Sequence, residues 1–350
     1  MLSLDLTERF MKEKLENRAF DSYAVCVGKC GEEKTLFSEN VNEDTYFDIA
    51  SMGKVLVTTT LLLKALSEKR LTLEDTLDMY FEGVPEEKRK ITIKQMLTHT
   101  SGIIRYNIPP EVGKKGREAV TDFILSKPLG YAPGTAGQYS CNAMILLGYI
   151  AEKIYGMTLE NAFNERIKKP LGYTRSKFNI EKDEPNAAIC YRWENADGIP
   201  HPWDDENVRA IGTSCGNGGQ FFTLRDIRTF VKAVLAKSEL LYSKDLFDLA
   251  EQDLTGGVAD PWGLGWLIVD ESYPQTGKLF PNGSFGHCGH TGTSMFMNRS
   301  EDLYVIILTN ATRFLNMRNC FNGYNYEEIT KLREEIHNEI SKDLGIKGRD

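Results

Sequence analysis

The most informative stretch of this 350-residue chain reads Phe47-Asp48-Ile49-Ala50-Ser51-Met52-Gly53-Lys54, and it holds the only Ser-x-x-Lys sequence. A helix-like apolar run follows, from Lys54 to Ala65. Residues three apart on a helix share a face, so the Ser51 hydroxyl and the Lys54 amine would lie together at a helix N-terminus. Such a pair can activate a serine for attack on an acyl group. The alternative interpretation is a solvated helix start with Ser51 as its N-cap.

Composition and charge exclude several classes of protein. Hydrophobic residues make up 41% and charged residues 26% of the chain, which is typical of a globular protein. The formal net charge is −8 and no basic stripe occurs, so we expect neither a nucleic-acid partner nor an anionic membrane partner. The length favours about two lobes or domains.

The N-terminal segment and the cysteines indicate the cellular compartment in which we expect the protein. The N-terminal segment Met1 to Arg9 contains an early acid and no apolar core, so it does not read as a secretory signal. The apolar runs are shorter than the ~18 residues that a membrane span requires. The 7 cysteines form no Cys-x-x-Cys pair, which favours reduced thiols in a cytosol over disulfides or a zinc site. We therefore expect a cytoplasmic protein.

The order of predicted elements indicates an α+β fold. Strands are expected at 22–29, 34–38, 263–269, 284–288, 293–298 and 303–309. Helices are expected at 6–17, 54–65, 93–99, 143–155, 159–169, 223–236 and 326–344. The simplest assembly joins both ends of the chain in one antiparallel sheet flanked by the terminal helices. We expect one domain over 1–350, with residues 1–85 and 255–350 in a sheet lobe and residues 86–254 in a mainly helical lobe.

A nucleophilic serine needs a base, a proton donor and an oxyanion site. Lys54 is the nearest base, but its ordinary pKa of ~10.4 would have to fall by about three units for work near pH 7. Burial and a neighbouring cation could lower it. Otherwise Lys54 stays charged and lowers the pKa of a second group, for which a tyrosine is the obvious candidate.

Five motifs in order resemble the serine β-lactamase and penicillin-binding-protein superfamily, and within it class C β-lactamases, D-alanyl-D-alanine carboxypeptidases and related esterases. They span about residues 20 to 310. They are Ser51-x-x-Lys54, His99-Thr100-Ser101-Gly102, Pro133-Gly134 with Tyr139-Ser140 before Leu146-Leu147-Gly148, Gly218-Gly219 with Thr223-x-x-Asp226, and Phe285-Gly286-His287-Cys288-Gly289. The resemblance implies a β-lactamase/transpeptidase-like fold.

The resemblance also implies roles for single residues. Ser51 resembles the acylated nucleophile, Lys54 its activating partner, and Tyr139 the tyrosine that relays protons. His287-x-Gly289 resembles the third motif on the strand edge, and the backbone N–H groups of Ser51 and His290 would form the oxyanion site. A tyrosine that merely caps the next helix and a plain strand histidine are the alternatives for Tyr139 and His287. His290-Thr291-Gly292 is a second possible register for the third motif.

Two positions depart from the family pattern. The second motif is Tyr-x-Asn in the family, but Cys141 stands at the asparagine position, and Asn142 would point elsewhere on a helix. Cys288 stands where the third motif usually carries a hydroxyl. A thiol is a weaker hydrogen-bond partner than an amide or hydroxyl. The acylation machinery is kept, while recognition of a β-lactam or a D-alanyl peptide is weakened. A metal or redox role for Cys141, Cys215 and Cys288 is an open alternative.

These observations predict a serine hydrolase that forms an acyl-enzyme on a small ester or amide, with an esterase or small-peptide hydrolase favoured. We expect no metal or organic cofactor, and the oligomeric state stays open. Trp193 and Trp203, in an aromatic loop, are expected to join Cys141, Cys288 and Gly289 in binding substrate. A β-lactamase or D-alanyl-D-alanine carboxypeptidase is the first alternative. A non-catalytic sensor is the second.

Overall fold

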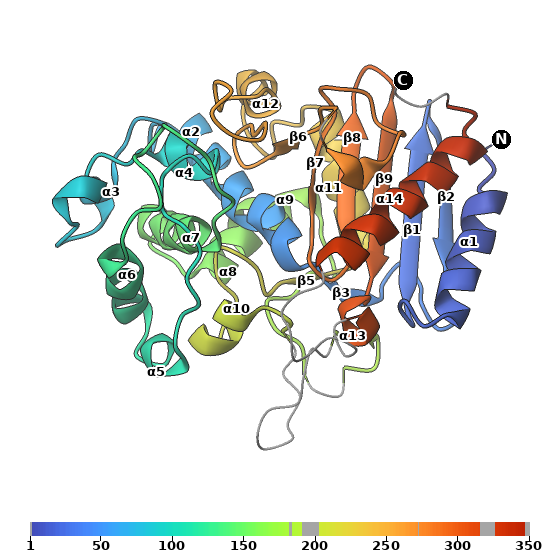
Figure 1. Cartoon of the computed structure of the whole chain (residues 1–350), viewed down its shortest axis with the longest axis horizontal. Helices are drawn as coiled ribbons and strands as arrows, with labels where there is room; N and C mark the ends of the chain where they lie inside the picture. The colour runs from blue at the N-terminus through green and yellow to red at the C-terminus, as the bar shows by residue number, and fades with distance from the viewer. Residues whose placement is uncertain (1, 182–183, 191–202, 272, 316–325, 347–350) are drawn as a thin grey trace.

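A computed structural model describes residues 2–181, 184–190, 203–271, 273–315 and 326–346 (Figure 1). Its main sheet has the strand order β2-β1-β9-β8-β7-β6, and every neighbouring pair is antiparallel. The two ends of the chain meet in the centre of this sheet, because β1 pairs with β9. The strands are β1 (Tyr23–Lys29), β2 (Glu32–Phe37), β6 (Leu267–Ile268), β7 (Phe285–Cys288), β8 (Ser294–Asn298) and β9 (Leu303–Thr309).

Both faces of the sheet are buried, and successive side chains along a strand enter different cores. On β1, Val25 and Val27 belong to one apolar cluster, whereas Ala24 and Cys26 belong to the other. The first cluster lies under the terminal helices α1 (Asp5–Glu16) and α14 (Tyr326–Asp343), which pack against each other. Burial on both faces explains why β1 and β9 are almost continuously apolar in sequence, whereas the edge strand β2 is largely exposed and polar.

Helix α11 (Leu224–Leu235) packs against β1, β8 and β9 on the sheet face opposite to α1 and α14 (Figure 1). It begins at Thr223, whose hydroxyl accepts a hydrogen bond from the Asp226 N–H, and its apolar stripe includes Ile227, Phe230 and Val234. The helix lies within the range 86–254 expected for the helical lobe, yet it covers the sheet.

The helices α2, α4, α6 and α8 and the turn η2 pack around α7, which is buried along most of its length. Its C-terminus is Gly156 in the left-handed conformation at φ 65°, as the Tyr155-Gly156 sequence predicts. The elements of this part are η2 (Lys54–Thr59), α2 (Thr60–Ser67), α3 (Leu77–Tyr80), η3 (Glu86–Lys88), α4 (Ile93–Leu97), α5 (Pro110–Gly113), α6 (Arg117–Ser126), α7 (Cys141–Tyr155), α8 (Leu159–Phe163), η4 (Asn164–Lys168), α9 (Lys169–Leu171), α10 (Glu206–Ile211) and α12 (Lys244–Ala250).

A small second sheet of order β4-β3-β5 connects the two parts and leads directly to Ser51. Its strands are β3 (Tyr46–Asp48), β4 (Ala187–Ala188) and β5 (Phe221–Phe222), followed by the short 3-10 turn η1 (Ala50–Met52). The smaller elements η5 (Pro274–Thr276) and α13 (Thr312–Leu315) complete the described chain. Among the described residues no helix is both long and apolar enough to cross a bilayer.

The predicted α+β class with an antiparallel sheet is confirmed. The expected strand 263–269 is shorter than predicted, since only Leu267–Ile268 pairs with β7. Gly263 and Gly265 precede it. A Cβ at Gly263 would overlap the Ala250 carbonyl and one at Gly265 the Thr59 side chain, so this segment approaches its neighbours too closely to continue the ladder.

Candidate active site

Ser51 and Lys54 form a direct contact at the start of the central helix. The Lys54 Nζ donates to the Ser51 Oγ over 2.8 Å. Lys54 opens a π-helical turn, η2, before the chain settles into the α-helix α2. Short π-helical turns occur frequently at functional sites, because they shift a side chain out of the regular helical series.

Lys54 is a buried cation with two acceptors. Its side chain is only 1% exposed, and Nζ also donates to the Asn217 carbonyl over 2.7 Å. Burial alone would lower the pKa of Lys54, but attraction by Cys141 and Tyr139 outweighs it, so the pKa lies above its ordinary value. Lys54 is therefore an ammonium in the resting protein. This favours the second of the two expectations, in which Lys54 stays charged and acts on a tyrosine.

The backbone before Ser51 is held in an unusual conformation. Ala50 has φ 46°, in the left-handed region that non-glycine residues rarely adopt. The Asp48 Oδ1 accepts from the Ala50 N–H over 2.8 Å, which fixes this turn. The Ser51 N–H has no backbone acceptor among the described residues, so it is available to an oxyanion.

A turn after β7 fixes the same segment from the other side. The Thr291 hydroxyl donates to the Asp48 carbonyl over 2.7 Å, and the Thr293 hydroxyl donates to the Ile49 carbonyl over 3.3 Å. Gly289 lies so close that a Cβ there would overlap both Thr293 Oγ1 and the Ile49 carbonyl. Three segments of chain thus converge on the segment of Ser51: this turn, the loop of Asn217 and the segment of Tyr139.

Tyr139 reaches the site from the residue before the N-cap of α7. The Ser140 Oγ accepts from the Ala143 N–H, which begins the helix, and the Tyr139 ring lies 5.1 Å from the Lys54 Nζ. The residue is half-buried, but its hydroxyl oxygen is buried without a hydrogen-bond partner of good geometry. Burial raises the pKa of Tyr139 to about 12, against the attraction of Lys54.

An aromatic cluster holds the Tyr139 ring in place. His99 lies 4.7 Å from Tyr139 and 4.5 Å from Trp262 between ring centroids. The His99 Nδ1 accepts from the Ser140 N–H over 3.3 Å, and burial lowers the pKa of His99 well below its ordinary value. His99 is therefore a neutral packing partner of Tyr139. The His99-Thr100-Ser101-Gly102 motif marked His99 in the sequence, whereas no sequence motif marked Trp262 or Asn217.

His287 is a neutral imidazole with an assigned tautomer. Its Nδ1 lies 2.8 Å from the Cys288 carbonyl, which can only accept, so Nδ1 carries the proton and Nε2 carries a lone pair. The Nε2 atom is buried and has no partner. Burial, together with the Lys54 charge, lowers the pKa of His287 to about 3. In this state His287 can accept a proton or a hydrogen bond but cannot donate one from Nε2.

The two candidate registers of the third motif occupy different places. His287 and Cys288 lie on β7, in register with Met295 and Ser294 of β8. His290, Thr291 and Gly292 form the turn after the strand, with Gly292 at φ 92°. The His290 Nε2 lies 3.8 Å from the Asp204 Oδ2. The first register thus lies at the end of β7, beyond the two residues that pair with β6, and the second lies in the turn that fixes Asp48.

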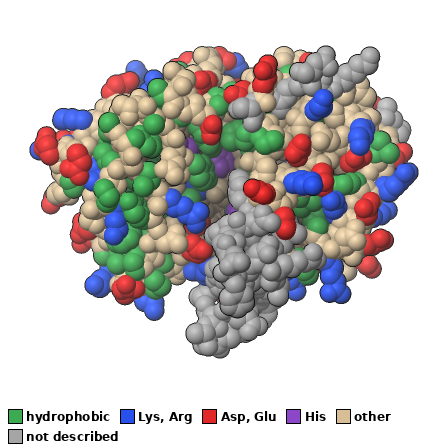
Figure 2. Space-filling view, viewed as in Figure 1, with side chains coloured by type: hydrophobic (Ala, Val, Ile, Leu, Met, Phe, Trp, Pro, Cys, Tyr) green, Lys and Arg blue, Asp and Glu red, His purple; other side chains and the backbone are tan. Residues whose placement is uncertain are grey.

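A cavity of about 560 Å³ opens in front of Ser51. In the space-filling view, histidine side chains are visible in a hollow between the helical part and the sheet (Figure 2). The cavity contains most of the predicted site residues. It is lined by Ala50, Ser51, Arg105, Tyr139, Cys141, Asp204, Asp205, Asp260, Trp262, Leu267, Tyr273, Gln275, His287, Cys288 and His290.

The structure does not bring every predicted residue to this cavity. Trp203 is 8% exposed and packs in the main core, and Gly289 contacts Ile49 and is not part of the lining. Cys215 does not line the cavity, and its Sγ donates a hydrogen bond to the Asn217 Oδ1. The Asn142 Oδ1 accepts from the Tyr106 N–H, so it points elsewhere as expected. Trp193 lies outside the described residues.

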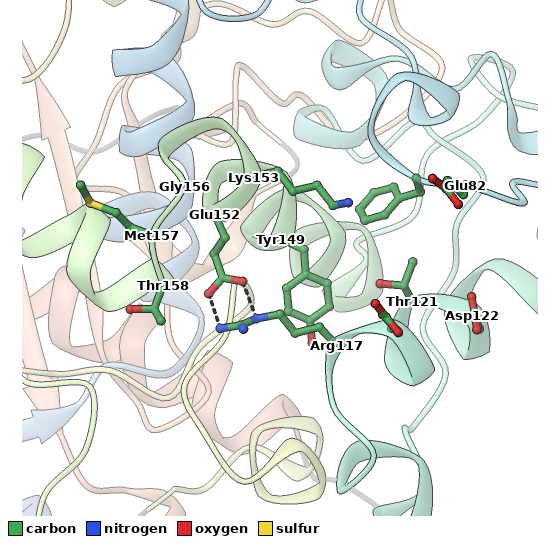
Figure 3. A pocket seen from close by; sticks show the side chains of 12 residues that line it. Glu82, Arg117, Thr121, Asp122, Tyr149, Glu152, Lys153, Gly156, Met157 and Thr158 are labelled. Carbon is green, nitrogen blue, oxygen red and sulfur yellow. Dashed lines mark hydrogen bonds and ion pairs between the residues drawn. The ribbon is translucent and has the colours of Figure 1, made fainter.

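A larger cavity of about 730 Å³ lies on the helical part, between α6 and the C-terminal half of α7 (Figure 3). Arg117 and Glu152 meet across it, with 2.7 Å between Arg117 Nη2 and Glu152 Oε1. No serine or cysteine belongs to its described lining. No group of three or more potential metal ligands occurs among the described residues either. The cavity at Ser51 is therefore the candidate active site.

The protonation states predict a pH dependence. With a pKa of about 12, only about one Tyr139 in 10⁵ is ionised at pH 7. Its ionised fraction rises tenfold per pH unit, so we expect kcat/KM for an ester to rise up to tenfold per unit between pH 6 and 9. No inflection is expected near pH 6.5, because His99 and His287 are neutral throughout this range. A bell-shaped profile with a limb near 6.5 would contradict these assignments.

Comparisons with known proteins agree with this geometry. The Beta-lactamase family model matches residues 7–319. A putative D-alanyl-D-alanine carboxypeptidase of Escherichia coli O157:H7 is 26% identical over 76% of this chain and 69% of its own length. A β-lactamase/D-alanine carboxypeptidase structure from Pseudomonas syringae has a TM-score of 0.74 and 19% identity, covering 97% of this chain and 98% of that one.

A second solved structure, the octameric penicillin-binding protein homologue from Pyrococcus abyssi, has a TM-score of 0.73 and 21% identity over 98% of this chain and 78% of its own. At such identities the two structures establish the fold alone. The family model covers most of the chain, including Ser51, Lys54, Tyr139 and His287. The chain therefore belongs to the Beta-lactamase family and is a serine hydrolase of that family.

Proposed function

We propose that the protein forms and hydrolyses an acyl-enzyme on Ser51 with a small ester or amide, and that it acts as an esterase or small-peptide hydrolase. The observation that carries this proposal is the 2.8 Å contact between Lys54 Nζ and Ser51 Oγ at the wall of a 560 Å³ cavity shared with Tyr139. The remaining residues supply steps that the pair alone cannot perform.

In the acylation step the Ser51 Oγ attacks the acyl carbon and loses its proton to the ionised oxygen of Tyr139. The Lys54 ammonium stabilises that ionised tyrosine. The backbone N–H groups of Ser51 and His290 hold the oxyanion of the tetrahedral intermediate. Tyr139 then returns the proton to the departing alcohol or amine. A water molecule then attacks the acyl carbon and loses its proton to Tyr139. Tyr139 returns a proton to the departing Ser51 Oγ, which frees the acyl group as an acid.

The substrate preference follows from two thiols in the lining. Cys141 takes the place of an amide and Cys288 the place of a hydroxyl, and both line the cavity. The Cys288 Sγ lies 3.3 Å from the Tyr273 hydroxyl, so the thiol is already engaged. These positions offer weaker hydrogen bonds to the amide and carboxylate of a penicillin or D-alanyl peptide. Simple esters and amides do not need those bonds.

The relatives' names favour a second candidate function, a D-alanyl-D-alanine carboxypeptidase or β-lactamase. It would use the same Ser51 chemistry on a different substrate. A third candidate, a non-catalytic penicillin-binding-like sensor, would need Ser51 to be unreactive, although the Lys54 contact is present.

A labelling and turnover experiment tests these candidates. We expect a fluorophosphonate to add one adduct mass to the protein and none to Ser51→Ala, by intact-mass spectrometry. We also expect kcat/KM for short-chain p-nitrophenyl esters to exceed that for a chromogenic cephalosporin by at least about a hundredfold. Faster cephalosporin turnover would favour the second candidate. The absence of an adduct on Ser51 would favour the sensor.

A further inference from the structure

His287 lines the cavity, and its buried ring nitrogen Nε2 is a hydrogen-bond acceptor where a carboxylate-binding site needs a donor. The Nδ1 proton of His287 is directed to the Cys288 carbonyl, so Nε2 offers a lone pair. This Nε2 atom has no partner within the protein, and the side chain is 3% exposed. A substrate carboxylate beside it would place an oxygen lone pair against the lone pair of the His287 Nε2. A substrate N–H or ammonium group would satisfy it.

The charges of the lining have the same preference. Three aspartates line the cavity, Asp204, Asp205 and Asp260, together with Arg105 and with His290, which lies 3.8 Å from Asp204. The Lys54 ammonium lies behind Ser51. Arg105 is already paired with Glu206, at 3.5 Å. Asp205 accepts from three neutral amides, the N–H groups of Asn207 and Val208 and the side chain of Asn217. These bonds hold its carboxylate in place, and its charge also attracts the Lys54 ammonium.

Asp260 lies at the exposed rim of the cavity, and no cation contacts it among the described residues. A carboxylate at such a position attracts a cationic group entering the cavity and repels an anionic one. Because the rim is open to solvent, this attraction weakens as the ionic strength rises.

Besides Lys54, whose charge acts on His287, a second cation near the third motif does not line the cavity. Arg333 on α14 is fully buried, its Nη2 donates to the Gly289 carbonyl over 2.7 Å, and it does not line the cavity. Its donors are thus on the far side of the Gly289 backbone. Arg333 supports the turn that carries the oxyanion N–H rather than offering hydrogen bonds to a substrate.

We propose that this cavity selects substrates that carry a positively charged amine close to the scissile ester or amide, and that it disfavours substrates carrying a carboxylate there. The inference rests on the proposed function and names its substrate class. It differs from the carboxylate recognition that the hydroxyl at the Cys288 position would support.

Matched esters of equal length test the proposal. On the leaving-group side the probes are the acetates of butanol, aminobutanol and hydroxybutyrate, and on the acyl side they are the methyl esters of pentanoate, aminopentanoate and glutarate. In at least one series we expect kcat/KM about tenfold higher for the amine than for the neutral ester, and about tenfold lower for the carboxylate. Both ratios should shrink toward one in 1 M salt.

The outcomes separate this inference from the proposed function. If the neutral esters are hydrolysed by the protein but not by Ser51→Ala, and the carboxylate esters are as good as the amines, the inference is overturned while the function stands. If no ester is hydrolysed, the proposed function fails and the inference fails with it.

A pair of variants links the preference to the rim. In Asp260→Asn the ratio of amine to carboxylate kcat/KM should fall about threefold or more. Asp245→Asn, at an exposed carboxylate on helix α12 that does not line the cavity, is the matched control and should keep the ratio. An unchanged ratio in Asp260→Asn, or an equal fall in both variants, would overturn the assignment of the preference to the cavity charges.

Discussion

A Lys54→Met variant is expected to lose about 10³- to 10⁵-fold in kcat/KM for any ester that the protein hydrolyses. The Lys54 ammonium is the only described cation that touches the Ser51 Oγ. Without it, ionised Tyr139 loses its stabilising charge and Ser51 loses its hydrogen-bond donor. The rate of adduct formation with a fluorophosphonate, measured by intact mass, should fall by a similar factor.

The same substitution should leave the fold intact. Lys54 is 1% exposed, and replacing a buried charge by an apolar side chain of similar length is often neutral or stabilising. We therefore expect a Tm equal to or above that of the parent protein by calorimetry. Lys88, 2% exposed and distant from the cavity, provides the control. Lys88→Met should keep full activity. A Lys54→Met protein that folds and retains more than a tenth of the activity would refute the assigned role.

Local sequence signals predicted the elements that are stabilised by their own residues. Thr92 forms a capping box with Gln95 at the start of α4, as its position before Ile93 indicates. The hairpin of β1 and β2, the apolar run of β9 and the glycine after α7 follow from turn chemistry and periodicity in the same way. Their patterns are short-range, so one sequence suffices to find them.

The contacts that complete the site are long-range and left no such signal. The Lys54 ammonium donates a hydrogen bond to the backbone carbonyl of Asn217, and every residue type has such a carbonyl. Thr291 was predicted as an alternative motif position, whereas its hydroxyl in fact holds the Asp48 backbone across 243 positions of sequence. Residue identity does not reveal which backbone carbonyls accept hydrogen bonds. The contacts that support Ser51 could therefore not be predicted from the sequence.

The position predicted for Trp203 was wrong for a related reason. Trp203 was expected at the substrate, but it packs in the main core, because a tryptophan in a loop serves burial as readily as binding. Trp262, which no motif marked, lies 5.8 Å from Tyr139 between ring centroids and lines the cavity. Whether an indole faces a core or a cavity depends on how distant segments assemble.

A Tyr139→Phe variant is expected to lose about 10²- to 10⁴-fold in kcat/KM, because it removes the group that carries the proton to and from Ser51. The ring and its packing against His99 and Trp262 are retained. The hydroxyl oxygen is buried and makes no hydrogen bond of good geometry, although it interacts with Lys54 and Ser51, so its removal costs little stability. We expect the Tm to stay the same or rise while activity falls, and the rise of kcat/KM with pH to flatten.

Tyr149 offers a matched control for this test. Its hydroxyl is likewise buried without a partner, but it lies on α7 at the cavity of the helical part, away from Ser51 (Figure 3). Tyr149→Phe should therefore show the same small effect on Tm and full activity. Equal losses of activity in both variants would mean that α7 packing, and not the Tyr139 hydroxyl, sets the rate. A Tyr139→Phe protein with unchanged kcat/KM and pH profile would leave Ser51 with Lys54 as its sole partner, since His287 already directs its proton to the Cys288 carbonyl.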